Sequence, residues 1–347
     1  MRSKVLTFPR DPAAVPECRP WAYKECLTRL RTIIQQKQLE PIFTVSKSDL
    51  SVVLFPYASS FSTLPLAVKA LPTSSLTPSL MPPIPKELVV DLGALTLYDH
   101  AVVIDDSSSM GFAFGGSRRE SVLCVLRNIS VINQLVNSPR GRELKTLCFS
   151  SAPNGRSNSS GGFDGWVNSH NFGGHSRVGS GVWEAVVKPL LKNWKIERPM
   201  IVMILTDGQI DPVEADILER AMLRATRKMR DLRASGAILF QFVNFGSPAG
   251  GYGAYKSSGQ QVLEMFINHP ELGRVVDVLN WETDQWDVAE TQLVKISRAQ
   301  EKRSPKQSKA VVEKMGRMLL APMMTSYRRR FSNGGGDEIG EGESWQD

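Results

Sequence analysis

The sequence predicts an α/β fold with a doubly wound, mostly parallel sheet and helices on both faces. Between about residues 88 and 290, short apolar runs alternate with amphipathic helical segments, which is typical of repeated β-α-β units. Hydrophobic residues make up 41% of the 347 residues, enough for a buried core of ordinary size. The longest apolar runs, such as 200–205, are far shorter than the roughly 20 residues that cross a bilayer, so we expect no transmembrane segment.

Composition divides the chain into five segments. Residues 1–58 form an N-terminal extension of unknown role, and residues 59–87 hold six prolines among serines and threonines, which predicts a linker. The sheet domain covers residues 88–290. A basic segment at 291–331 and an acidic, disordered tail at 332–347 follow it. We therefore expect one folded α/β domain with irregular extensions on both sides.

The expected elements follow in chain order. In the extension, apolar side chains on one face predict a helix around residues 27–34, and 52–55 is a short strand-like run. In the sheet domain we predict strands at 101–104, 147–149, 200–205, 237–243 and 275–279. Four helices are expected. The first begins at Ser117, which forms a capping box with Glu120, and the second covers 182–191. The third runs from Asp211-Pro212 to about Gly236, and the fourth covers 260–267. Right-handed crossovers then bring the carboxyl ends of the strands to one edge, where ligands bind in such sheets.

Two acidic segments follow apolar strands at that edge. Asp105 opens the run Asp105-Asp106-Ser107-Ser108-Ser109, in which alternate side chains can converge on one point as the chain leaves the strand. Asp207 follows the strand at 200–205, and Gly208 after it allows a tight turn. Two carboxylates with several hydroxyls form the oxygen-ligand set that Mg²⁺ or Mn²⁺ prefers. The sequence therefore predicts a divalent-metal site, with Asp106 as a turn or supporting residue rather than a ligand.

This D-x-S-x-S signature, with a T-D-G acid on a later strand, resembles the metal-ion-dependent adhesion site of von Willebrand factor type A domains. The resemblance spans about Leu95 to Trp281 and is to the intracellular type A domain proteins common in fungi. It implies that Ser107 and Ser109 contact the metal directly, that Asp105 acts through water, and that Asp207 does either. It also implies that the open site binds an Asp or Glu of a protein partner.

The family's remaining ligand is a Thr in a T-P-x-G turn, and the matching text here is Ser176-Arg177-Val178-Gly179. The resemblance thus assigns this role to Ser176, with Ser180 as the alternative. Serine keeps the hydroxyl but loses the methyl group that restricts the rotamer. Arg177 replaces the proline and brings a cation close to the metal, so we expect weaker metal binding than in the parent family.

No enzyme motif is complete, and we expect no enzymatic activity. The run Gly174-His175-Ser176-Arg177-Val178 lacks the final glycine of a nucleophile elbow. Asp105 lacks a second acid two positions later, which an aspartyl phosphatase would need. The four histidines show no metal-ligand spacing. A type A fold that binds no metal stays open as an alternative.

The net charge of +7 is concentrated in one stretch, since residues 298–330 hold ten Lys and Arg against two Glu. An alternative function is therefore polyanion binding, to nucleic acid or an anionic membrane, with the sheet domain as scaffold. Four cysteines form no C-x-x-C pair, and an apolar signal-peptide core is absent from the first ten residues. These features favour a cytoplasmic location, with the nucleus as the alternative.

Overall fold

The structure is a computed structural model that describes residues 20–43, 93–111, 118–129 in part, 144–153, 163–192, 198–246 and 258–281. Its centre is a five-stranded sheet in the order β2-β1-β3-β4-β5, in which all neighbouring strands pair in parallel. The predicted α/β class is therefore confirmed. The predicted linker, the strand-like run at 52–55 and both C-terminal segments lie outside the described residues.

All five predicted strands are present, each within two residues of its expected bounds. They are β1 (Asp99–Ile104), β2 (Thr146–Phe149), β3 (Met200–Thr206), β4 (Ile238–Asn244) and β5 (Val276–Asn280). Every residue of β3 and β4 is buried, as expected for central strands of a parallel sheet that is covered on both faces.

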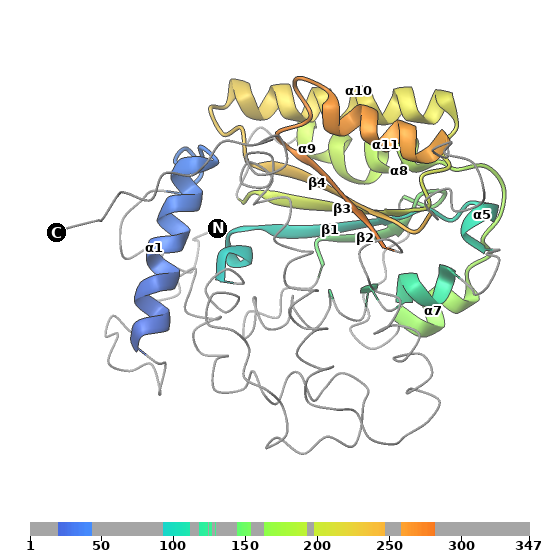
Figure 1. Ribbon diagram of the computed structural model, residues 1–347, viewed down its shortest axis with the longest axis horizontal. Coiled ribbons are helices and arrows are strands. Elements are labelled where there is room, and N and C mark those ends of the chain that lie inside the picture. The colour runs from blue at the N-terminus through green and yellow to red at the C-terminus, as the bar shows by residue number, and fades with distance from the viewer. Residues whose placement is uncertain are drawn as a thin grey trace, which may run out of the picture.

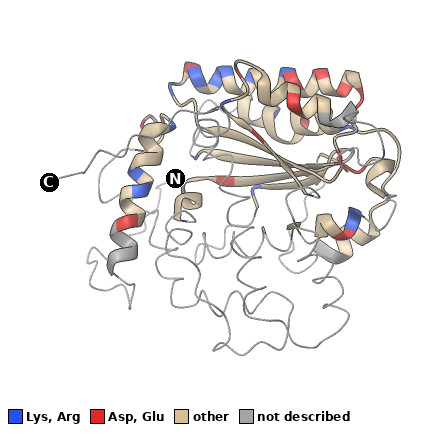
Figure 2. Cartoon of the chain, in the orientation of Figure 1, with Lys and Arg blue, Asp and Glu red and all other residues tan. Residues whose placement is uncertain are grey.

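Helices cover the two faces of the sheet (Figure 1). On one face lie α8 (Val178–Val182), α10 (Pro212–Asp231) and α11 (Ser258–Asn268), and α7 (Phe163–Ser169) lies on the other. A π-helical turn, η4 (Trp183–Val187), joins α8 to α9 (Lys188–Lys192). The smaller elements are η3 (Leu95–Leu97) and α5 (Ser108–Gly111), and residues 118–123, 125, 126 and 129 are also helical. Among the described residues, charged residues lie mainly on the helices, whereas the strands hold few of them (Figure 2).

Two predicted helix ends differ from the structure. The helix expected at 182–191 begins earlier, with α8 at Val178. The helix expected to reach Gly236 ends at Asp231, because Arg233 adopts a positive φ of 56° and the Ala234 N–H donates to the Met229 carbonyl. This backbone conformation closes the last turn of a helix.

The N-terminal helix α1 (Pro20–Gln36) joins the core of the sheet domain. Leu30 and Ile34 are fully buried in the same hydrophobic cluster as the strands. Just before β4, the Gly236 N–H donates to the Lys37 carbonyl over 2.9 Å, and a Cβ at Gly236 would lie 2.4 Å from the Lys37 Cβ. Only glycine allows this close approach, so the end of α1 is fixed against the start of β4.

The strand order reverses beside β1, because the chain runs from β1 outward to β2 and then crosses back to β3. Such a reversal opens a crevice at the carboxyl ends of the two strands. Residues that follow β1 and β3 therefore face a common site. Among the described residues, no helix is long and apolar enough to span a bilayer.

Candidate metal site at the carboxyl edge of the sheet

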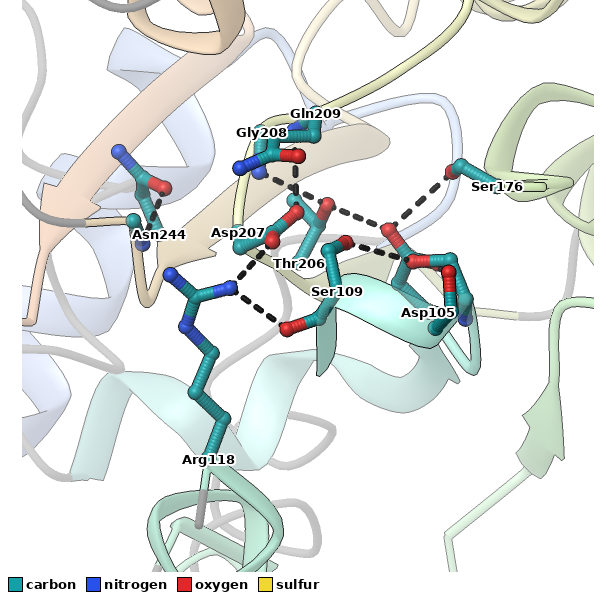
Figure 3. A network of polar contacts seen from close by, with 12 residues as sticks. Asp105, Ser109, Arg118, Ser176, Thr206, Asp207, Gly208, Gln209 and Asn244 are labelled. Atoms are coloured by element: carbon teal, nitrogen blue, oxygen red, sulfur yellow. Dashed lines mark hydrogen bonds and ion pairs between the residues drawn. The ribbon is translucent and has the colours of Figure 1, made fainter. Parts of the chain in front are cut away.

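Asp105 lies at the centre of the site and is fully buried (Figure 3). Its Oδ2 accepts hydrogen bonds from Thr206 Oγ1 at 2.8 Å and from Ser176 Oγ at 3.1 Å. Its Oδ1 accepts a third from the backbone N–H of Ser107 at 3.1 Å. One carboxylate thus connects three parts of the chain: its own loop, the end of β3, and the segment that leads into α8.

Burial raises the pKa of Asp105 to about 6. Hydrogen bonds from Thr206 and Ser107 oppose this rise, and the nearby Asp207 carboxylate adds to it. Two carboxylates that are both buried therefore lie close enough to repel each other. A cation placed between them would relieve this repulsion.

The serines of the signature alternate in direction. Ser107 Oγ and Ser109 Oγ lie 3.2 Å apart, whereas the exposed Ser108 donates its hydroxyl to the Gly174 carbonyl over 3.2 Å. The alternation expected from sequence is therefore present, and it brings the two predicted ligands together.

The two candidates for the fifth ligand occupy different places. Ser176 is buried and donates to Asp105, as described above. Ser180 instead donates its backbone N–H and its hydroxyl to the Glu214 carboxylate, at 2.8 and 2.7 Å. Glu214 lies in the first turn of α10, so its carboxylate links the start of α8 to that turn. Of the two serines, only Ser176 bonds to the Asp105 carboxylate.

Asp207 is held by the turn that follows β3. Gly208 adopts a φ of +79°, and its N–H donates to Thr206 Oγ1 over 3.0 Å. The Gln209 N–H donates to Asp207 Oδ1, also over 3.0 Å. The Oδ2 of Asp207 pairs with the guanidinium of Arg118. The side chain of Asp207 is fully buried.

Arg118 is the site residue that sequence reasoning missed. Its Nη1 donates both to Asp207 and, over 2.7 Å, to the backbone carbonyl of Ser109 (Figure 3). The guanidinium thereby puts a positive charge beside a predicted metal ligand. One signal for it exists in the sequence: Arg118 is the first residue after the predicted N-cap Ser117, and that helix follows the signature loop directly.

Asp106 turns away from this cluster. Its carboxylate accepts hydrogen bonds from Ser150 Oγ at 2.8 Å, from the N–H and hydroxyl of Ser151, and contacts His170 Nε2 at 2.6 Å. Burial would raise the pKa of Asp106, but the hydrogen bonds from Ser151, His170 and Ser150 outweigh it and lower the pKa. The His170 ring stacks on Phe149 with centroids 3.5 Å apart. Asp106 therefore links β1 to the end of β2 and α7, a supporting role.

The donor set suits a hard divalent cation, since two carboxylates and three hydroxyls meet at one edge and all are oxygen ligands. Within the part of the chain that the structure describes, no three or more His, Cys, Asp and Glu side chains gather in a group that could hold a metal. A divalent ion would thus depend on the serine hydroxyls and on water, and it would displace Arg118 from Asp207.

The comparisons with known proteins are negative. No protein-family model matches the chain, and neither a curated protein nor a solved structure gives a significant match. The resemblance to von Willebrand factor type A domains therefore stays a prediction, based on the signature and on its position at the sheet edge.

Proposed function

We propose that this protein is a divalent-cation-dependent protein-interaction module. Mg²⁺ or Mn²⁺ would be held by Asp105, Ser107, Ser109, Ser176 and Asp207. The observation that carries the proposal is that hydrogen bonds connect all five residues. Asp105, Ser107, Ser109 and Ser176 are linked directly, and Arg118 links Asp207 to the Ser109 carbonyl. Three loops that are far apart in sequence supply them.

The charge of the site defines what a bound metal could recognise. Asp105 and Asp207 together balance one divalent cation, so the loaded site would be close to neutral. A bound Mg²⁺ would supply an open coordination position for an oxygen ligand. The carboxylate of an Asp or Glu on a partner protein could fill it at low electrostatic cost.

The first test is isothermal titration of the full chain with Mg²⁺ and with Mn²⁺, beside three serine variants. We expect Ser107→Ala and Ser109→Ala to weaken binding by about tenfold or more, a loss of at least 1.4 kcal/mol. Ser108→Ala is the matched control, because Ser108 belongs to the same turn but bonds to the Gly174 carbonyl. Thermal unfolding in chelator shows whether each variant is folded. Absence of binding by the wild type, or equal binding by all variants, would contradict the proposal.

The second test concerns the partner. A protein captured from lysate in Mg²⁺ is expected to be released by a chelator and recaptured when Mg²⁺ is restored. The Ser109→Ala variant should not retain it, whereas Ser108→Ala should. Capture that survives the chelator would count against a metal-dependent interface.

Polyanion binding through residues 298–330 is the alternative that the charge distribution raised, and that segment lies outside the described residues. We place the proposed interaction in the cytoplasm, with the nucleus as the alternative. In support, Cys148 is buried and forms no disulfide, which suits a reducing compartment.

A further inference from the structure

A pocket of about 680 Å³ extends from the candidate metal site along α10 and α11. At one end it is lined by Ser107, Ser109 and Ser176. Apolar side chains follow, and carboxylates lie along the α10 side: the apolar residues are Ile210, Pro212, Ala215, Val262 and Met265, and the acids are Asp211, Asp216 and Glu219. We call this pocket the α10 groove.

The apolar part of the α10 groove is accessible. Met265 is 46% exposed and is one of the two large hydrophobic residues that stand out as exposed in the described part of the chain. An exposed, flexible methionine in a concave surface is typical of protein-binding sites, because its side chain adapts to varied apolar partners.

The two ends of the α10 groove differ in charge. Three carboxylates and one histidine, His175, line the groove. No Lys or Arg is found among the described residues that line it. Asp216 pairs with Arg220, and histidines lie 3.5 Å from Asp211 and 3.6 Å from Glu219. The pairs of Asp216 and Asp211 are exposed, so they are weak and screened by solvent, whereas Glu219 and His269 are partly buried. The α10 side of the groove is therefore acidic, whereas a metal ion at the serine end would make that end attractive to anions.

We propose that the α10 groove binds an extended segment of a partner protein in which an Asp or Glu is followed, in either chain direction, by an apolar residue and then by a Lys or Arg. This inference rests on the proposed function, which places the acid of the partner at the metal. The apolar side chain packs on Met265 and Val262, and the basic side chain pairs with Asp216 and Glu219.

The helix fixes the spacing of the two charges. Asp211, the N-cap of α10, follows the proposed ligand Asp207 by four residues, and Glu219 lies eight residues further on; a rise of about 1.5 Å per residue makes this roughly 12 Å. An extended chain covers that distance in three to four residues, at about 3.3 Å each. The acid and the base of the partner are thus three or four positions apart, with the apolar residue between them.

The test is selection from a random dodecapeptide library displayed on phage, against the immobilised full chain in Mg²⁺ and in chelator. The second bait is the double variant Asp216→Lys with Glu219→Lys. Its matched control is Glu40→Lys with Asp231→Lys, which changes the net charge equally at exposed positions outside the groove. Thermal unfolding confirms that each bait is folded.

In Mg²⁺ we expect the wild type and the control to enrich peptides with an acid and a base three or four positions apart. The groove variant should keep the Mg²⁺-dependent choice of acids but lose the preference for bases. It should also bind a synthetic consensus peptide about tenfold more weakly, a difference of 1.4 kcal/mol.

Three results would overturn the inference, each in a distinguishable way. In the first, Mg²⁺ enriches peptides that contain an acid but no base at this spacing, or the groove variant keeps the preference for the base. Either outcome would refute the groove assignment and leave the proposed function standing. Selection that is the same in Mg²⁺ and in chelator would refute both. Purely apolar peptides would point to a different occupant, such as a second copy of this chain, and would also refute the inference.

Discussion

Asp105 and Asp106 are neighbours in sequence, but their carboxylates serve different parts of the structure. Asp105 binds side chains from the β3 loop and from the segment before α8, and its pKa is raised by burial. Asp106 is surrounded by donors from the β2 loop and α7, and its pKa is lowered. The hydrogen bonds of Asp106 favour its ionised form, whereas burial disfavours the ionised form of Asp105.

Asp105→Asn is expected to stabilise the metal-free protein. A carboxyl whose pKa rises on folding, here from 3.8 to about 6, contributes stability that is complete below pH 3.8 and is lost as the pH rises through 6. At pH 7 its ionisation therefore costs stability, and asparagine removes that cost, by roughly 1–3 kcal/mol at 1.36 kcal/mol per pKa unit. Thermal unfolding in chelator should show a higher midpoint for the variant at pH 7 and a shrinking difference toward pH 4. A variant that is less stable at pH 7 would contradict this.

Arg118→Gln is expected to strengthen Mg²⁺ binding about tenfold, or 1.4 kcal/mol. The metal must displace the guanidinium from Asp207, and hydrogen bonds between charged groups are worth about 1.5–3 kcal/mol. Titration calorimetry measures the change. Arg119→Gln is the control, because Arg119 donates to the backbone carbonyls of Asn168 and His170. Weaker binding in Arg118→Gln would mean that Arg118 orients the ligands instead of competing with the metal.

Sequence reasoning found the residues of the site whose position follows from strand ends. Asp105 and Asp207 each come directly after an apolar strand, and the alternation of Ser107 and Ser109 follows from extended backbone geometry. Arg118 was not found, because its position depends on how a helix after a loop packs back on the edge. That packing is a tertiary contact, and the one local signal, the position of Arg118 directly after the predicted N-cap Ser117, does not show where its side chain points.

At the scale of elements, the contact between α8 and α10 positions Ser176 at the site. A Cβ at Gly179 would lie 2.2 Å from the Glu214 carbonyl oxygen, and one at Gly181 would lie 2.7 Å from the Ser150 Cα. These glycines let α8 lie directly on α10 and on the β2 loop. The start of α8, and with it Ser176, is thereby held against the sheet edge.

Gly179→Ala is therefore expected to destabilise the protein by about 1–3 kcal/mol, the usual cost of overpacking. It should also weaken Mg²⁺ binding, because α8 must move and Ser176 moves with it. Gly165→Ala is the control, since a Cβ at Gly165 in α7 meets nothing within 4 Å. Alanine there replaces a helical glycine and should be neutral or stabilising by up to about 1 kcal/mol. Chemical denaturation of both variants measures the difference, and equal stability would refute the packing argument.

At the scale of the whole molecule, the strands were predictable because each is a short apolar run between helix signals. The attachment of α1 was not, since its apolar face at residues 27–34 predicts that it packs but not against what. Its position depends on Gly236, whose importance appears only when Lys37 lies beside it.

Leu30→Ala is expected to lower the stability of the entire described fold by about 2–5 kcal/mol, the range for a buried leucine. Because α1 shares one core with the sheet, unfolding should stay a single transition that shifts as a whole. Circular dichroism and tryptophan fluorescence should report the same shifted midpoint. Two separate transitions, or an unchanged sheet transition, would show that α1 folds independently.

The contact between Lys37 and Gly236 also has a consequence during synthesis of the chain. About 200 residues separate the two, and a ribosome adds roughly 5–20 residues per second. α1 therefore leaves the ribosome some 10 to 40 seconds before the surface that buries its leucines has been made. For that interval the helix is an exposed apolar segment on a nascent chain, and a chaperone that covers such segments would act on this protein from α1 onward.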